Sequence, residues 1–359
     1  MARTDGAVRP RSGEGTGAGP LAPPPVALLL PGQGAQQQGM ALGLYGSEPA
    51  FTDAVDEVFR LLRGEGARIR ADWLSESPVV ALDDVRRAQP LLFAVNYGLS
   101  RMLLDWGVRP AALLGHSAGE AVAAVVAGVL SLPDAVALLA ERVALVAGAP
   151  PGGMLAVAAA PADVEPFLTD DVVVGAVNSP TQVMLAGPDP ELARVAETLQ
   201  VRGFTCVRAK ASSGFHSPML RSVCARQIPA FDSVQLYEAR LRVISGYTAG
   251  RLTRAQALDP AFWALQPAEP VLFGPALNTL LADGPYLLVE AGPGQSLTTL
   301  ARRHPAVTRG GSAALPLLPA RPRGPEKDRE AALKAARRLA ELGHVPRHVA
   351  ERRAAGRTA

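Results

Sequence analysis

The sequence predicts an α/β protein in which a large parallel-sheet domain carries a small α+β insert. Between residues 26 and 150, short apolar runs bounded by Gly or Pro alternate with segments of helical periodicity. This alternation is typical of a parallel sheet covered by helices on both faces. Residues 151–212 instead follow the order strand, helix, strand, strand, helix, strand, which is typical of a ferredoxin-like unit. The first pattern returns over residues 213–319, so we expect the small domain to be inserted into the large one.

The composition agrees with a globular organisation. Of the 359 residues, 48% are hydrophobic and 19% are charged, which excludes a chain that is disordered throughout. Residues 1–25 are rich in Gly and Pro and are expected to be a disordered leader. Residues 320–359 are expected to form a basic C-terminal helix and tail.

The individual elements follow from local patterns. The first strand is expected at residues 26–30, where VALLL precedes the tight turn PGQG. The next helix is expected at 51–62, with Thr52 as its cap. Further elements of the large domain are helices at 90–104, 118–129 and 135–147, strands at 111–114 and 287–290, a linker at 319–325 and a final helix at 326–341. The insert is expected to have strands at 154–159, 172–177, 182–186 and 205–210, and helices at 161–168 and 190–201.

Charge and cysteine content argue against several classes of function. Residues 320–359 carry 11 Lys and Arg against 5 Asp and Glu, so the basic character lies there and the rest of the chain is mildly acidic. The plain interpretation of this segment is a solvated helix with a frayed end. The chain has no aromatic-interleaved basic motif, which argues against nucleic-acid binding. Cys206 and Cys224 have no metal-like spacing, which argues against a disulfide framework and a metal site.

Segments that would direct the chain to a membrane are also missing from the sequence pattern. The longest uncharged apolar stretch, at 121–133, is too short to cross a bilayer. Residues 1–25 lack the apolar core of a signal peptide. We therefore expect a cytoplasmic protein that does not bind membranes.

The strongest local signal is GHSAG at residues 115–119, a G-x-S-x-G motif between a predicted strand and a helix of small residues. In such a nucleophile elbow, glycines allow the strand and the helix to approach closely around a strained serine. Amides at the start of the helix are then available to an oxyanion. The motif predicts that Ser117 is the nucleophile of an α/β-hydrolase-like domain.

A serine nucleophile needs a base, and the chain has five histidines. His116 is next to Ser117, but successive side chains in an elbow diverge, so His116 is expected to support the turn. His216 lies in the loop SGFHSP, where the chain returns from the insert to the large domain. A cleft between domains is a common place for a catalytic site. His216 is therefore the candidate base, with a structural role as the alternative.

Arg142 lies on a helical stripe that is otherwise apolar. The other members of the stripe, at positions 135, 138, 139, 145 and 146, are Ala, Leu or Val. Burying an unpaired guanidinium is costly, so Arg142 is expected to meet an anion. That anion is either a carboxylate of the protein or one that is bound, and a snorkelling side chain is the remaining alternative.

These features belong to a larger set of ordered motifs, which resembles a known family. The set consists of PGQG at 31–34, AQP at 88–90, GHSAGE at 115–120, Arg142 twenty-five residues after Ser117, GGM at 152–154, NSP at 178–180, GFHSP at 214–218 and EAGPG at 290–294. It resembles the malonyl-CoA:acyl-carrier-protein transacylases, and more closely the acyltransferase domains of polyketide synthases. The resemblance covers about residues 26–320.

The resemblance implies a role for each matching residue. Ser117 would accept the acyl group, and His216 would be its general base. The backbone carbonyl of Gln266, in the segment WALQ, would orient His216. The backbone amides of Gln33 and Ala118 would form the oxyanion hole.

The resemblance also implies how a substrate is held. Arg142 would pair bidentately with the free carboxylate of a malonyl-type group. Gln89 would support either Arg142 or the serine. The pocket would further be lined by Met154, Asn178, Phe215 and His116.

Departures from the family pattern bear on the acyl group. Phe215 crowds the α-carbon and favours malonyl. Ser213 and Gly214 remove bulk beside it, and Ala118 stands where the family usually has a larger residue. Each of these changes widens the pocket. Pro267, directly after Gln266, is a further departure that bears on how firmly His216 is held.

The function that the resemblance implies is transfer of a malonyl-type group from coenzyme A to the phosphopantetheine thiol of an acyl carrier protein by a ping-pong mechanism. The expected setting is polyketide biosynthesis, and fatty-acid synthesis is the alternative setting. The coenzyme A thioester is a substrate, and no permanently bound cofactor is expected. The alternatives are a transferase that moves a larger acyl group between carrier proteins, a proofreading acyl-carrier hydrolase, and a non-catalytic docking partner.

Carrier proteins are acidic, so basic residues near the cleft are candidates for docking, with ordinary surface charge as the alternative. These candidates are Arg221, Arg226, Arg302 and Arg303.

Overall fold

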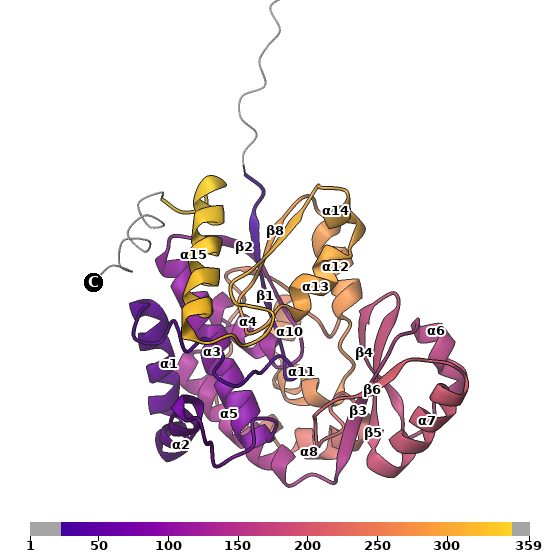
Figure 1. Ribbon diagram of the computed structural model, residues 1–359. Coiled ribbons are helices and arrows are strands. Elements are labelled where there is room, and N and C mark those ends of the chain that lie inside the picture. Colours follow the sequence, from indigo (N-terminus) through magenta and orange to yellow (C-terminus); the bar gives the residue numbers. More distant parts are fainter. Residues whose placement is uncertain (1–22, 347–359) are drawn as a thin grey trace, which may run out of the picture.

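A five-stranded parallel sheet forms the centre of the large domain, with the strand order β7-β2-β1-β8-β9 (Figure 1). The computed structural model describes residues 23–346, so almost all of the expected leader and the end of the tail lie outside the described residues. Leu30 pairs with Gly115, and Leu29 pairs with Glu290, so the carboxyl ends of the three central strands meet at one edge. The strands are β1 Val26–Leu30, β2 Pro110–Gly115, β7 Arg242–Ile244, β8 Leu287–Glu290 and β9 Ala313–Pro316.

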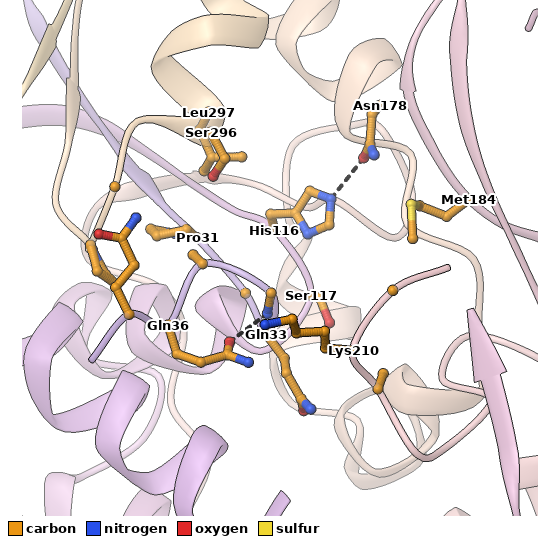
Figure 2. A pocket seen from close by; sticks show the side chains of 18 of the residues that line it. Pro31, Gln33, Gln36, His116, Ser117, Asn178, Met184, Lys210, Ser296 and Leu297 are labelled. Carbon is orange, nitrogen blue, oxygen red and sulfur yellow. Dashed lines mark hydrogen bonds between the residues drawn. The ribbon is translucent and has the colours of Figure 1, made fainter. Parts of the chain in front are cut away.

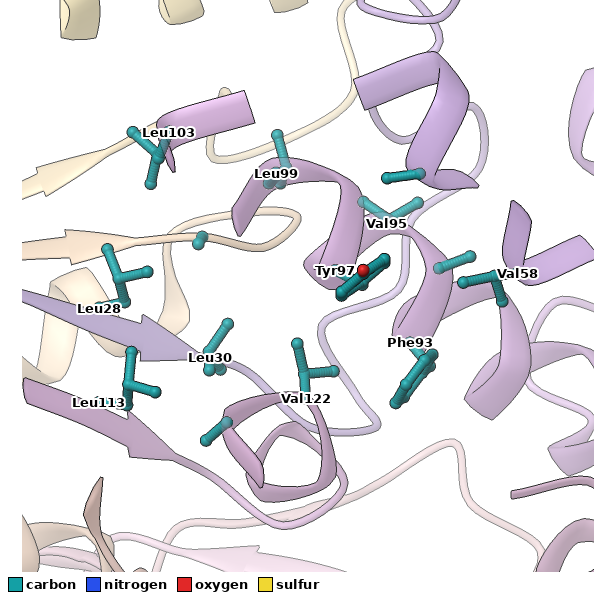
Figure 3. Packing of buried hydrophobic residues seen from close by; sticks show 14 of the residues in the cluster. Leu28, Leu30, Val58, Phe93, Val95, Tyr97, Leu99, Leu103, Leu113 and Val122 are labelled. Atoms are coloured by element: carbon teal, nitrogen blue, oxygen red, sulfur yellow. The ribbon is translucent and has the colours of Figure 1, made fainter. Parts of the chain in front are cut away.

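Helices cover both faces of this sheet, as the sequence predicts. Leu28 and Leu30 of β1 belong to a core cluster with the helices that precede and follow β2, and Figure 3 shows them on the side of Val122. Ala27 and Leu29 belong to a second cluster on the opposite face. Since successive residues of a strand point to opposite faces, a strand that is buried throughout requires this double cover.

The helices of the large domain have the following bounds: α1 Pro49–Leu61, α2 Arg63–Leu74, α3 Val85–Asp105, α4 Gly119–Ala127, α5 Leu132–Ala147, α8 Arg221–Ala225, α9 Ile228–Asp232, α10 Arg254–Ala257, α11 Pro260–Leu265, α12 Phe273–Ala282, α13 Ser296–Arg302, α14 Pro305–Thr308 and α15 Pro325–Glu341. Two 3₁₀ turns, Pro218–Leu220 and Gln266–Ala268, lie between them. No helix within the described residues is long and apolar enough to span a membrane.

The small domain has the predicted ferredoxin-like organisation and lies to one side of the large one (Figure 1). Its four-stranded antiparallel sheet has the order β4-β5-β3-β6, which puts its first and third strands in the middle. Its own core lies beneath two helices. The elements are β3 Gly152–Val157, α6 Pro161–Val164, a 3₁₀ turn Glu165–Phe167, β4 Val173–Ser179, β5 Gln182–Pro188, α7 Asp189–Val201 and β6 Cys206–Arg208.

Two predicted helix starts are wrong. The α1 helix begins at Pro49, and Thr52 is not its cap, because the Thr52 hydroxyl donates back to the carbonyl of Glu48 inside the first turn. The α3 helix begins five residues before the predicted start, since Asp84 caps it by accepting the N–H of Arg86. Pro90 consequently lies inside that helix.

The C-terminal helix α15 is packed rather than solvated, which corrects the interpretation based on charge. Ala332, Ala335, Ala336 and Leu339 are buried in the main core cluster. The carboxylate of Asp328 accepts the N–H of Gly43 at 3.1 Å, which anchors the helix to the segment after β1. The basic residues lie on the other faces of an amphipathic helix.

Candidate active site

Ser117 occupies the sharp turn between the end of β2 and the start of α4. Its backbone φ is +53°, a left-handed conformation that L-residues rarely adopt. The flanking glycines are required by close approach, because a Cβ on Gly119 would collide with the carbonyl of Leu30, and one on Gly115 with the backbone of Glu120. The motif therefore places Ser117 at the carboxyl edge of the sheet, where open α/β sheets bind ligands.

His216 reaches Ser117 from the loop that follows the small domain. Its Nε2 lies 2.7 Å from Oγ of Ser117. Its backbone φ is +65°, and its N–H donates to the carbonyl of Pro267 at 2.6 Å. The fold thus brings together the candidate nucleophile and the candidate base, which are 99 residues apart in the chain.

The carbonyl hydrogen-bonded to Nδ1 of His216 belongs to Glu269, whereas the resemblance implied the carbonyl of Gln266. Nδ1 of His216 lies 2.9 Å from the carbonyl oxygen of Glu269. The carbonyl of Gln266 accepts the N–H of Glu269 at 3.2 Å, which closes the 3₁₀ turn, and it acts on the imidazole only as a weaker acceptor. A bond from Nδ1–H to a carbonyl leaves the lone pair on Nε2, facing Ser117.

Burial lowers the pKa of His216 to about 4, because the imidazolium loses its hydration. The hydrogen bond to the Glu269 carbonyl opposes this shift, and the neighbouring His116 and Arg142 reinforce it. At neutral pH the imidazole is therefore unprotonated and able to accept the proton of Ser117.

We expect the imidazole of His216 to stay neutral from pH 8 down to about pH 5 and to protonate only near pH 4, since its pKa lies far below that of a free histidine. The measurement is an NMR titration of ¹³C-labelled histidines, with the His216 signal assigned by its loss in His216→Gln. Exposed histidines in the same sample serve as the internal reference. A midpoint for His216 between pH 6 and 7 would contradict the prediction.

Two backbone amides beside Ser117, those of Gln33 and Ala118, have no acceptor among the described residues. A Cβ on Gly32 would lie 2.9 Å from Cβ of Ser117 and 3.3 Å from the nitrogen of Ala118, so the turn after β1 lies directly against the elbow. Unpaired amides next to a nucleophile are what an oxyanion hole requires.

Gln89 supports this turn rather than Arg142 or Ser117, which corrects its expected contact. Its Nε2 donates to Oε1 of Gln33 at 3.0 Å. The reason is that α3 runs along the turn after β1: Asn96, two helical turns further on, donates to the carbonyl of Pro31 at 2.8 Å. Gln89 therefore fixes the residue that carries one of the two unpaired amides.

Arg142 lies on α5 with its guanidinium among neutral partners. Nε donates to Gln227 at 3.1 Å, and a terminal nitrogen donates to the carbonyl of Trp263 at 2.7 Å. Burial lowers its pKa, although an arginine keeps its charge. Within the described residues no carboxylate pairs with it. Of the two anions considered for Arg142, a protein carboxylate is thus not found among the described residues, and the guanidinium is hydrogen-bonded to neutral groups instead.

A cavity of about 1010 Å³ lies in front of Ser117 and His216 (Figure 2). His116 contributes to its wall, and its Nε2 lies 2.8 Å from Oδ1 of Asn178, which links the elbow to strand β4 of the small domain. Arg142 does not line this cavity. Besides Ser117 and His216, six of the residues expected at the site line it, namely Gln33, Gln89, His116, Met154, Asn178 and Phe215.

The basic residues expected to dock a carrier protein differ in position. Arg303 lines the cavity. Arg226 and Arg302 are exposed but do not line it. Lys210 lines the cavity as well and was not among the expected residues, although it is the last basic residue before the loop that carries His216.

Arg221 is joined to the catalytic pair by one intermediate residue. Its guanidinium forms an ion pair with the carboxylate of Glu269, whose backbone carbonyl holds His216. Both side chains are largely exposed. The positive charge of Arg221 is therefore partly neutralised, which weakens the expectation that it attracts an acidic partner on its own.

Glu120, which ends the motif GHSAGE, is fully buried, and the sequence pattern alone assigned it no role. One carboxylate oxygen accepts the Ser245 hydroxyl at 2.7 Å and the amide of Gln266 at 3.3 Å, and the other accepts the N–H of Gly246 at 2.7 Å. Burial raises its pKa to about 7, while the Ser245 hydroxyl and the N–H of Gly246 act in the opposite direction. Glu120 therefore ties the elbow to the segment after β7 and to the turn that holds His216.

Comparison with known proteins decides the family. A family model described as "Acyl transferase domain" matches residues 28–323. The chain belongs to the acyltransferase domain family. The acyltransferase is 36% identical over 281 residues to a phenolphthiocerol/phthiocerol polyketide synthase of Mycobacterium tuberculosis, an alignment that covers 78% of this chain and 19% of that protein. It is 32% identical over 310 residues to the spectinabilin polyketide synthase system protein NorB of Streptomyces orinoci, covering 84% of this chain and 14% of NorB.

Solved structures agree with this assignment. The acyltransferase matches the acyl transferase domain of SpnD in complex with 2-(pent-4-yn-1-yl)malonyl, with a TM-score of 0.83, 31% identity and coverage of 92% of this chain and 79% of that one. It matches FabD from Acinetobacter baumannii with a TM-score of 0.76, 25% identity and coverage of 88% and 99%. The predicted resemblance to transacylases and polyketide synthase acyltransferase domains is confirmed. The acyltransferase spans about a fifth or less of the length of the curated relatives named above.

Proposed function

We propose that this acyltransferase moves a malonyl-type acyl group from coenzyme A to the phosphopantetheine thiol of an acyl carrier protein in polyketide biosynthesis. The observation that carries the proposal is the 2.7 Å contact between Ser117 Oγ and His216 Nε2 at the wall of a large cavity. The guanidinium of Arg142, without a carboxylate partner among the described residues, supports an acyl group with a free carboxylate.

In the first half-reaction, Oγ of Ser117 attacks the thioester carbonyl while His216 Nε2 takes the hydroxyl proton. The carbonyl oxygen becomes negative and is stabilised by the amides of Gln33 and Ala118. The carbon–sulfur bond then breaks, and His216 returns its proton to the departing thiol of coenzyme A. The product is an ester on Ser117.

In the second half-reaction, the roles run in reverse with a new thiol. His216 accepts the proton of the phosphopantetheine thiol, and the sulfur attacks the ester carbonyl. The carbon–oxygen bond breaks, Ser117 regains its proton, and the carrier protein leaves with the acyl group. A neutral imidazole at physiological pH, which the lowered pKa of His216 provides, suits both directions.

The test is intact-protein mass spectrometry after incubation with malonyl-, methylmalonyl- or acetyl-coenzyme A. We expect a stable malonyl adduct on Ser117 and its loss when a phosphopantetheinylated carrier protein is added. Release of the adduct to water at the same rate without a carrier would indicate the hydrolase instead. Absence of any adduct from all three thioesters would overturn the malonyl proposal and point to a larger, carrier-bound donor.

Reversing the charge of Arg303 is expected to slow the second half-reaction by about tenfold, since carrier proteins are acidic and Arg303 lines the cavity. The variant is Arg303→Glu, and the measurement is single-turnover transfer from malonyl-Ser117 to the carrier. Loading of Ser117 from malonyl-N-acetylcysteamine, a thioester that lacks the phosphate groups of coenzyme A, should not change. Arg309→Glu, an exposed arginine outside the cavity, is the matched control. An equal loss in both half-reactions would refute a docking role.

A further inference from the structure

The loop after β7 places a tyrosine next to the catalytic pair. The ring centroid of Tyr247 lies 6.0 Å from that of His216, with an angle of 46° between the planes. Its hydroxyl also interacts with the hydroxyl of Ser117 and with the charge of Arg142. The ring therefore lies next to the base, and the hydroxyl lies near the nucleophile and within the electrostatic influence of Arg142. Tyr247 lies outside all of the motifs that carry the family resemblance.

The backbone around Tyr247 is rigidly held. The Ser245 hydroxyl donates to Glu120 at 2.7 Å and accepts the N–H of Tyr247 at 3.1 Å. The N–H of Gly246 donates to the same carboxylate at 2.7 Å. A Cβ on Gly246 would lie 2.8 Å from the carbonyl of Gly115, so this segment also packs directly against the elbow. The tyrosine consequently has little freedom to move away from Ser117.

The open cavity ends at the catalytic pair. Ser117 and His216 line it, but Tyr247 and Arg142 do not. Tyr247 therefore lies behind the catalytic pair as seen from the cavity, with its ring beside His216 and its hydroxyl near Ser117.

We propose that Tyr247 is a specificity-determining residue that limits the width of the acyl pocket, so that the enzyme accepts malonyl and discriminates against malonyl groups substituted at the α-carbon. This inference rests on the proposed function. An acyl group esterified to Ser117 with its carboxylate on Arg142 is fixed at both ends, which leaves the α-carbon beside the phenol. The hydrogens of a methylene group fit there, whereas a methyl or ethyl branch competes with the ring for the same space.

The size of the effect follows from the chemistry of small pockets. One methyl group too many in an apolar pocket changes kcat/KM by roughly 10- to 200-fold. We therefore expect the wild-type enzyme to prefer malonyl- over methylmalonyl-coenzyme A within this range. Burial raises the pKa of Tyr247, so its phenol is neutral and does not itself repel the substrate carboxylate.

The experiment measures kcat/KM for loading of Ser117 with both thioesters, in the wild type and in three variants. In Tyr247→Ala and Tyr247→Leu, the ratio of malonyl to methylmalonyl should fall by at least about tenfold, because methylmalonyl gains. In Tyr247→Phe, which removes only the hydroxyl, the ratio should stay within about threefold. Tyr237→Ala, at an exposed tyrosine ten residues upstream, is the control and should leave the ratio unchanged. Thermal unfolding identifies variants that fail to fold. If Tyr247→Ala does not fold, the result for Tyr247→Leu tests the inference.

Three results would overturn the inference: an unchanged ratio in Tyr247→Ala and Tyr247→Leu, a wild type that loads methylmalonyl as well as malonyl, or a ratio in Tyr247→Phe that collapses as far as in Tyr247→Ala. The last of these would assign selectivity to the hydroxyl rather than to the ring. Failure of the proposed function has a different signature, because then malonyl-coenzyme A would not load Ser117 in the wild type at all.

Discussion

Replacing Ser117 by alanine is expected to abolish formation of the acyl-enzyme and to reduce thioester turnover by about 10⁴-fold or more, the loss that follows removal of an enzyme nucleophile. The reason is geometric. Ser117 is the side chain at the left-handed turn of the elbow, and its Oγ is the group that His216 Nε2 contacts at 2.7 Å. No water molecule can occupy the same position without losing the advantage of a fixed nucleophile.

The measurement combines mass spectrometry of the protein with the rate of coenzyme A release. Ser212→Ala is a suitable control, since Ser212 is exposed and lies only four residues before His216 in the chain. That variant should load as fast as the wild type. If Ser117→Ala still carried a malonyl adduct, the nucleophile would be another residue and the mechanism proposed above would be wrong.

Replacing Arg142 by alanine is expected to slow loading with malonyl-coenzyme A by roughly 30- to 1000-fold, while loading with acetyl-coenzyme A is unchanged or faster. A buried, bidentate contact between a guanidinium and a carboxylate contributes about 2–4 kcal/mol, which corresponds to this range at about 1.4 kcal/mol per factor of ten. Arg142 is available for such a contact, because its partners Gln227 and the Trp263 carbonyl are neutral.

The comparison of the two thioesters separates binding from structural damage. Arg142 also joins α5 to α11 through the Trp263 carbonyl, and damage to the fold from losing this contact would slow loading with both thioesters alike. Arg142→Lys keeps the charge but not the planar fork and should lie between the wild type and Arg142→Ala. An equal decrease for malonyl and acetyl would show that Arg142 is structural and does not recognise the carboxylate.

The sheet and the nucleophile could be predicted because short, local patterns determine them. A five-residue apolar run such as VALLL is stable only between two layers of helices. The glycines around Ser117 are needed wherever a strand, a turn and a helix approach this closely. The histidine could be proposed because it follows the return to the large domain, although the 99-residue separation hides the pairing itself.

Contacts made by irregular segments could not be predicted in the same way. Which carbonyl meets His216 depends on how the 3₁₀ turn at Gln266–Ala268 uses the Gln266 oxygen, and residue order does not show this. The helix α2 was missed because Gly64 and Gly66 weaken its propensity, yet Gly66 lets it pack against the backbone of Phe59. Tyr247 was missed because its neighbours Ser245 and Gly246 are far from the elbow in sequence and are tied to it through the buried carboxylate of Glu120.

The way α15 is held has a consequence for anyone who wishes to transplant this catalytic unit into a chimaeric assembly line. The match to the family model ends at residue 323, which suggests a splice point just before the helix. Cutting there would remove Leu339 and three alanines of α15 from the main hydrophobic core. It would also leave the N–H of Gly43 without its acceptor, the Asp328 carboxylate. A donor fragment that runs past Val345, itself buried in that interior, keeps α15 and all of these contacts.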